Sequence, residues 1–285
     1  MGNFNVFINT LQGFIRTFVY ANFWVAGAVW GLTRFSEELF SYSGTSIAVL
    51  NAAATLVIYG FARLFEGPAA VESISRISQW RQKMPKTAFL SMGLGAATIL
   101  FELIRINEAA LTGHYALAGA FALLYPLPFI LKKKGGGLRS VPGLKLILIA
   151  LVWAYVTAVI PALRADADWY WPFVERFLWT AALTIPFDIR DAELDANSIR
   201  TLPHLVGSKN SVWVANMLLW ISYLILVNYF KVPWIPLTGL YLFFATVVIN
   251  SHPKMGDLYY SILIEGLPFL LLGLWYLLPY LWTPQ

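Results

Sequence analysis

The segment TIPFDIRDAELDANSIRTLPHLVG, residues 184–207, is a charged stretch set between long apolar ones. Asp191 and Asp195 are four residues apart, so on a helix they lie on one face about 6 Å from each other. Asp188 lies three residues before Asp191 and flanks the same face. Carboxylates at this spacing suit a hard cation such as Mg²⁺, which takes oxygen ligands together with water and phosphate. An ordinary solvated helix end is the alternative for this spacing taken alone.

The residues around these acids carry a family resemblance. The motif DIRDAELD at 188–195, followed by IRTLP at 199–203, resembles the second aspartate-rich motif of the UbiA superfamily of intramembrane prenyltransferases. In that family the motif holds Mg²⁺ against the diphosphate of an isoprenoid donor. The resemblance implies a metal site whose ligands are Asp188, Asp191 and Asp195. It also implies a substrate site beside it, which includes Arg190.

The composition is that of a protein embedded in a membrane. Hydrophobic residues make up 59% of the chain, charged residues only 12%, and the mean hydropathy is +0.65. A soluble core has no use for so much apolar surface. The absence of cysteine excludes disulfides and thiolate metal sites. The pI near 9.3 comes from basic residues in short segments between apolar runs, so we expect membrane lipids as partners and no nucleic acid.

Nine apolar runs are long enough to cross about 30 Å of hydrocarbon. They cover residues 14–33, 44–65, 87–106, 114–131, 143–163, 169–187, 210–230, 233–250 and 258–281. The sequence therefore predicts an all-α membrane protein of nine transmembrane helices, in a single polytopic domain over residues 1–285. The UbiA resemblance implies the same number of helices, in a bundle around a central cavity. Charged residues inside the runs, Glu175, Arg176 and Glu265, are expected to pair or to face the bundle interior.

Lysines and arginines fall mostly on one side of these nine runs. They concentrate in segments 66–86, 132–142, 188–209 and 251–257, which makes that side cytoplasmic by the positive-inside rule. We therefore expect a cytoplasmic N-terminus and an external C-terminus, in the inner (plasma) membrane of a bacterium. The aspartate motif opens on the cytoplasmic side.

The first acidic motif of the family, Asn-x-x-x-Asp-x-x-x-Asp, has no counterpart in this chain. The corresponding residues 57–66 read VIYGFARLFE and contain no aspartate, while Tyr59 and Arg63 share a helix face with Glu66 one turn further on. Two facing acidic clusters let Mg²⁺ neutralise a diphosphate, so the loss of one weakens that site. In one interpretation Arg63 is a catalytic residue whose guanidinium contacts phosphate, with Tyr59 beside the substrate. In the other, Arg63 pairs with Glu66 or Asp191 and closes an inactive site.

Basic residues in two further segments are candidates for substrate binding. Arg76 and Lys83 belong to ESISRISQWRQKMPK, residues 72–86, where the family has a helical cap over the active site. A basic cap attracts anionic headgroups or a diphosphate, although positive-inside charge alone also explains these residues. Lys145 enters an apolar helix at its cytoplasmic end, where it can meet phosphate. Tyr125 lies in a stretch that resembles the fourth helix of the family, which implies a place in the substrate site.

Three functions fit these observations. The resemblance implies transfer of an isoprenoid group from a prenyl diphosphate, with Mg²⁺, to a lipophilic acceptor such as an aromatic quinone precursor. An aromatic cavity suits the allylic cation of that reaction, because aromatic faces stabilise positive charge. The second function is that of a catalytically silent relative that binds an isoprenoid or quinone. The third, a small-solute transporter, is disfavoured because no inverted repeat is evident.

Overall fold

Residues 2–42, 46–62, 80, 83–124, 143–195 and 201–281 are described by the computed structural model, and every regular element within these ranges is a helix. The α-helices are α1 (Gly2–Tyr20), α2 (Phe23–Leu39), α3 (Ser46–Ala62), α5 (Pro85–Ile106), α6 (Ala109–Leu124), α7 (Leu144–Ala154), α8 (Ile160–Arg164), α9 (Tyr170–Asp195), α10 (Leu202–Val206), α11 (Ser208–Asn228), α12 (Trp234–Ile249) and α13 (Glu265–Leu281). Two π-helical segments, η2 (Tyr155–Val159) and η3 (Tyr259–Ile264), continue into α8 and α13.

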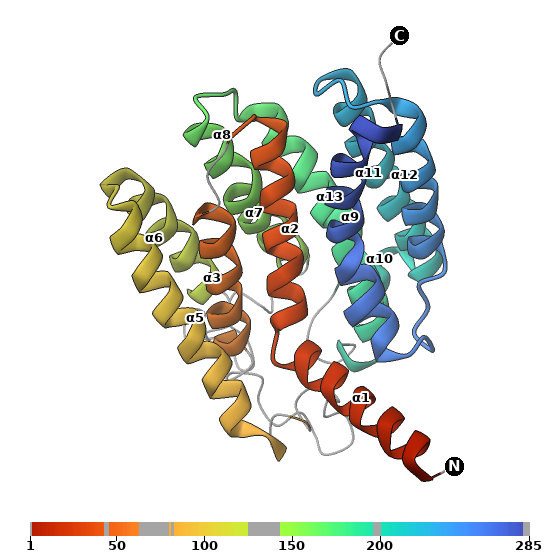
Figure 1. Ribbon diagram of the computed structural model, residues 1–285. Coiled ribbons are helices and arrows are strands. Elements are labelled where there is room, and N and C mark those ends of the chain that lie inside the picture. The colour runs from red at the N-terminus through yellow and green to blue at the C-terminus, as the bar shows by residue number, and fades with distance from the viewer. Residues whose placement is uncertain are drawn as a thin grey trace.

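The long helices stand side by side and alternate in direction, as Figure 1 shows. The two termini lie at opposite ends of this bundle, with the N-terminus at the lower end of the view. The start of α5, the end of α9 and the connection from α12 to η3 also lie at the lower end. Lys83, Lys86, Arg190 and Lys254 lie at these places, so the lower end corresponds to the predicted cytoplasmic side.

Each of the nine predicted apolar runs contains a helix. Among the described residues, four helical stretches are both long and apolar enough to cross a membrane: Pro85–Ile106, Leu144–Arg164, Ser208–Asn228 and Tyr259–Leu281. Shorter apolar helices cover Ile47–Ala62, Ala109–Leu123 and Trp234–Ile249. The chain is therefore an integral membrane protein, while the number of nine crossings stays a prediction.

The outer surface of the bundle is apolar, as lipid contact requires. On α5, the side chains of Phe89, Leu90, Phe101 and Ile104 are each at least 60% exposed. Such a surface is costly in water and neutral in hydrocarbon. A helix satisfies most of its backbone hydrogen bonds internally, which is the condition for lying in a bilayer.

The first apolar run, 14–33, is not one helix as predicted. α1 ends at Tyr20, and Asn22 has a φ of 68° before α2 begins at Phe23. Asparagine tolerates this left-handed conformation better than most residues, so the chain can turn sharply here. α1 consequently leaves the bundle at its lower end and lies at an angle to the other helices (Figure 1).

Six helical segments close a ring. α2 packs against α3, α3 against α6, α6 against α7, α7 against α9, α9 against η3, and η3 back against α2. At the last of these contacts, the indole of Trp24 on α2 donates to the carbonyl of Ile262 in η3 at 3.0 Å.

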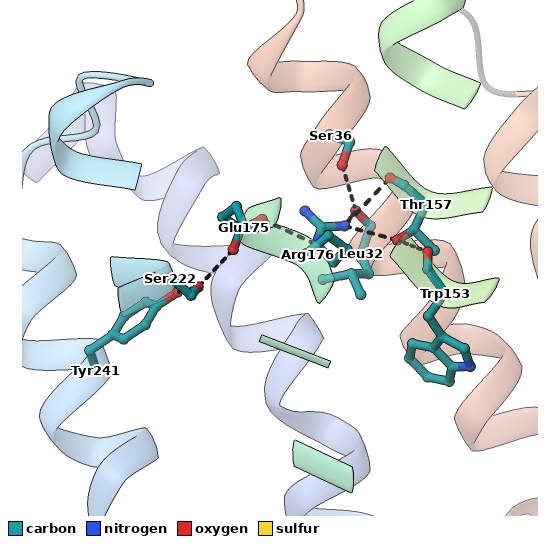
Figure 2. A network of polar contacts seen from close by, with 8 residues as sticks. All are labelled: Leu32, Ser36, Trp153, Thr157, Glu175, Arg176, Ser222 and Tyr241. Carbon is teal, nitrogen blue, oxygen red and sulfur yellow. Dashed lines mark hydrogen bonds and ion pairs between the residues drawn. The ribbon is translucent and has the colours of Figure 1, made fainter. Parts of the chain in front are cut away.

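A buried ion pair near the start of α9 contacts several other helices (Figure 2). Glu175 and Arg176 on α9 are each 1% exposed, and Arg176 Nε lies 3.3 Å from Glu175 Oε2. Arg176 Nη1 also donates to the carbonyl of Leu32 on α2 at 3.1 Å and to the hydroxyl of Thr157 in η2 at 3.1 Å. The predicted pairing of these two residues is confirmed, and the guanidinium joins α9 to α2 and η2.

The carboxylate of this pair reaches two further helices. Ser222 on α11 donates to Glu175 Oε1 at 2.9 Å, and its hydroxyl lies 3.1 Å from the hydroxyl of Tyr241 on α12. Tyr241 is fully buried in the same core. One ion pair therefore connects α2, η2, α9, α11 and α12 through hydrogen bonds, and these fix how the helices are rotated against one another.

The first prediction concerns which ends of the helices share a side of the membrane. Because the chain has no cysteine, single cysteines report accessibility without background. Ala110→Cys at the start of α6 and Lys209→Cys at the start of α11 are both exposed and lie at opposite ends of the bundle. An impermeant maleimide added to intact cells should label Ala110→Cys. It should label Lys209→Cys only after the cells are lysed. Labelling of both variants from one side would contradict the arrangement.

The second prediction concerns the buried ion pair. Arg176→Met should lower the free energy of unfolding by about 3 kcal/mol, because it leaves the carboxylate of Glu175 buried without its counter-ion. Arg164→Met is the matched control, since its pair with Glu108 at 3.0 Å is partly exposed and should contribute less than about 1 kcal/mol. Unfolding of the purified protein in mixed micelles measures both values. Equal losses would show that Arg176 has no special role.

Candidate binding cavity

The ring of helices lines a cavity of about 300 Å³, a volume at the lower end of the range of small-molecule sites. Its wall is mostly apolar and aromatic, with charged residues where α7, α9 and α13 face one another. α2 and α3 contribute Val25, Ile58, Tyr59 and Ala62; α6 and α7 contribute Phe121, Ala122, Lys145, Leu148, Ile149, Val152 and Trp153; α9 contributes Trp179, Thr180, Leu183, Thr184, Phe187, Arg190 and Asp191; and η3 with α13 contributes Ser261, Ile264, Glu265 and Pro268.

The first charged contact of the cavity joins α7 to α9. Lys145, at the second position of α7, places its Nζ 2.7 Å from Oδ1 of Asp188 on α9. The side chain of Asp188 is 2% exposed and that of Lys145 is 15% exposed. A carboxylate so deeply buried needs a counter-ion, and the lysine supplies it. Lys145 therefore lines the cavity as half of an ion pair.

The second charged contact lies one turn further along α9. Arg190 Nε is 2.7 Å from Asp191 Oδ1 and Arg190 Nη2 is 3.0 Å from Asp191 Oδ2, so the guanidinium binds both carboxylate oxygens. Its Nη1 lies 3.8 Å from Oδ1 of Asp257, in the connection between α12 and η3. The guanidinium carbon lies 5.2 Å from the ring centre of Phe187 and 5.4 Å from that of Tyr260. Acids and aromatic faces therefore surround this one base.

Helical spacing explains why α9 presents both contacts. Asp188 and Asp191 are three residues apart, which puts them on neighbouring parts of one helix face. α9 packs against both α7 and η3. Asp188 meets α7, whereas Arg190 and Asp191 meet the segment around η3. The sequence of α9 determines which residues share a helix face, and the neighbouring helices determine which residues these side chains contact.

Five of the predicted site residues come together here. Tyr59, Lys145, Arg190 and Asp191 line the cavity, and Asp188 is bound to Lys145. Lys83 is exposed beside the start of α5 and is not part of the wall. Three predicted residues lie outside the described part of the chain: Arg63, Arg76 and Tyr125. Asp195 ends α9, and its side chain is also outside the described residues.

Magnesium binds carboxylate, water and phosphate oxygens in near-octahedral geometry, and a base that already holds a carboxylate competes with it. Asp188 and Asp191 are both engaged by a base in this structure. Within the described side chains, no group of three histidine, aspartate or glutamate residues is arranged to hold a metal ion. As placed here, Asp188 and Asp191 therefore do not fit a magnesium ion. The role of Asp195 as a ligand stays a prediction.

Two features of the site were missed from the sequence. Asp257 was assigned only to a cytoplasmic loop, yet it lies beside Arg190. The hydropathy pattern places Arg190 and Asp257 at the same end of the bundle, and this was the sequence signal for their proximity. Hydropathy does not predict which side chains contact each other. Individual aromatic wall residues such as Trp153, Trp179 and Phe187 were also not identified, because aromatic residues are common on every membrane helix.

The fold and the cavity define a class of protein: a helical membrane bundle that holds an apolar compartment with charged groups on its wall. Among solved structures, the chain is similar to a UbiA homolog from Archaeoglobus fulgidus bound to GPP and Mg²⁺, with a TM-score of 0.61 and 13% sequence identity. The similarity covers 90% of this chain and 97% of that one. No protein-family model matches the chain, and no curated protein does. The chain therefore has a UbiA-like fold.

The third prediction tests the pair between α7 and α9. Lys145→Met should lower the free energy of unfolding by about 3 kcal/mol, because the buried carboxylate of Asp188 loses its counter-ion. The double variant Lys145→Met/Asp188→Asn should recover most of that loss, since a neutral amide needs no counter-charge. Lys209→Met, which changes an exposed lysine at the same end of the bundle, is the control. Equal losses in the single and double variants would contradict the pair.

Proposed function

We propose that this protein is a membrane-embedded prenyltransferase of the UbiA type, which binds a prenyl diphosphate in the cavity and transfers its prenyl group to a lipophilic acceptor. The observation that carries this proposal is the combination of an aromatic cavity with two bases on its wall, Lys145 and Arg190, in a UbiA-like fold. The apolar wall suits an isoprenoid tail, and the bases suit an anionic head. The solved homolog binds GPP within the same fold.

The cavity suits the chemistry of prenyl transfer. In that reaction the allylic C–O bond breaks, diphosphate leaves with the electron pair, and an electron-rich acceptor attacks the carbon cation and then loses a proton. The rings of Trp153, Trp179 and Phe187 stabilise such a cation without reacting with it. The apolar wall also gives water few polar groups to bind near the cation. Lys145 and Arg190 would meet the charge of the departing diphosphate.

The charge pattern of the sequence also favours an anionic ligand. Bases clearly outnumber acids in segments 63–86 and 132–145. A local excess of positive charge raises the concentration of anions near a protein. The acceptor is proposed to enter from the lipid, because the outer surface of the bundle is apolar.

Binding without turnover is the second candidate. The pairing of Asp188 with Lys145 and of Asp191 with Arg190 favours it, since acids that would hold metal ions against the diphosphate are already neutralised. The chain also lacks the first acidic motif of the family at residues 57–66. A silent relative would keep the cavity and bind the isoprenoid without ionising it.

One experiment tests the proposal and separates the two candidates. The purified protein is titrated with geranyl, farnesyl and geranylgeranyl diphosphate, and with inorganic diphosphate and farnesol as the two halves of the ligand. A prenyl diphosphate should bind more tightly than either half, because the cavity contacts both tail and head. Diphosphate release is then measured with a hydroxybenzoate acceptor. Binding with release supports the transferase, binding without release supports the silent relative, and no preference for the prenyl diphosphates contradicts both.

The fourth prediction tests where the tail lies. Ala122→Trp on α6 should weaken binding of the longest prenyl diphosphate by about tenfold, or about 1.4 kcal/mol, because the indole takes volume from the cavity. The shortest ligand should be affected less. Ala120→Trp adds the same indole at an exposed position of the same helix and is the matched control. Equal effects of both substitutions on all chain lengths would place the tail elsewhere.

A further inference from the structure

Three acids surround a single guanidinium at the cavity wall. Asp191 binds it through both carboxylate oxygens, at 2.7 Å and 3.0 Å, and Asp257 Oδ1 lies 3.8 Å away. Glu265 lines the same cavity and is close enough to act on Arg190 electrostatically. The three acids come from α9, from the connection before η3, and from the start of α13. This arrangement brings together three carboxylates that are separated in the sequence.

Such a group of acids repels itself unless a cation lies among them. Here that cation is the guanidinium of Arg190, whose side chain is 21% exposed. Two aromatic faces, those of Phe187 and Tyr260, lie 5.2 Å and 5.4 Å from the guanidinium carbon. Aromatic faces attract cations through their quadrupole. The acids and the rings together therefore form surroundings suited to positive charge.

We infer that Arg190 is a built-in counter-cation, which occupies the place among Asp191, Asp257 and Glu265 that a divalent metal ion would otherwise take. A metal ion would need oxygens of Asp191, and both of these are bound to the guanidinium. Arginine stays charged under all ordinary conditions and fits a carboxylate with two parallel hydrogen bonds, so it is a stable occupant. In the absence of ligand, the wild-type site should therefore bind Mg²⁺ or Mn²⁺ weakly or not at all.

The consequence for the ligand rests on the proposed function. With a fixed cation at the wall, a prenyl diphosphate should bind with little or no dependence on added Mg²⁺. The inference about the metal itself is measured without any prenyl ligand. A failure of prenyl diphosphate binding would therefore overturn the proposed function and leave the inference about Arg190 standing, and the reverse also holds.

The fifth prediction is a gain of metal binding on removal of the arginine. Arg190→Gln leaves three carboxylates without their cation, so Mn²⁺ should bind at least about tenfold more tightly than in the wild type, because hard cations prefer carboxylate oxygens. Arg190→Met tests the same loss while keeping an apolar stem against the two rings. Electron paramagnetic resonance of free Mn²⁺ follows the titration, and Mg²⁺ is added as a competitor.

Two further variants show whether the gained ion is at this place. Arg190→Gln/Asp191→Asn should lose the added Mn²⁺ affinity, because one of the three carboxylates becomes a neutral amide. Lys145→Gln is the matched control, since it removes a base of the same cavity whose printed partner is the single acid Asp188, and it should gain no metal binding.

Several results would overturn the inference. Tight Mn²⁺ binding by the wild type, equal to that of Arg190→Gln, would show that the guanidinium does not exclude the metal. An absence of binding in folded Arg190→Gln and Arg190→Met would show that the acids do not form a cation site. The wild-type titration alone can overturn the inference, whether or not either variant folds.

Discussion

The buried pair of Glu175 and Arg176 is the interaction on which the arrangement of the helices depends. Helices in a bilayer gain little from hydrophobic association, because lipid is as apolar as their own side chains, so packing and polar contacts determine their relative rotation. Here one pair reaches α2, η2, α9, α11 and α12. A rotation of α9 against these neighbours would leave a buried charge without partners, at a cost of several kcal/mol. The same helix carries Asp188, Arg190 and Asp191, so the pair also sets where these side chains point.

The cavity follows from this constraint. With α9 fixed in rotation, its lower half turns aromatic and charged residues toward the space between α7 and α13. The charged groups there are arranged in pairs: Lys145 with Asp188, and Arg190 with Asp191. Pairing lowers the cost of keeping ions in an apolar compartment. It also means that an incoming anion has to share each base with an acid that is already present.

The sequence was sufficient for the class of fold, because long apolar runs separated by basic segments leave few alternatives in a bilayer. It did not reveal the break at Asn22, since a hydropathy average over 14–33 is insensitive to one left-handed residue. The helical spacing of Asp188 and Asp191 correctly placed both on one face of α9. The contacts from other parts of the chain were not predictable: Lys145 reaches Asp188 from α7, and Asp257 reaches Arg190 from the connection before η3. Spacing along one helix carries no information about such contacts.

The two π-helical segments determine how this chain has to be aligned with others. A π turn contains one residue more than an α turn, and one residue rotates every later position of a helix by about 100°. Where another protein has an α turn at 155–159 or 259–264, an alignment without a gap would therefore pair lipid-facing positions of one protein with cavity-facing positions of the other. At 13% identity to the solved UbiA homolog, sequence alone cannot correct such a slip. Residue-by-residue transfer of roles across these segments has to follow superposed backbones, and Glu265, directly after η3, is the position where the choice matters most.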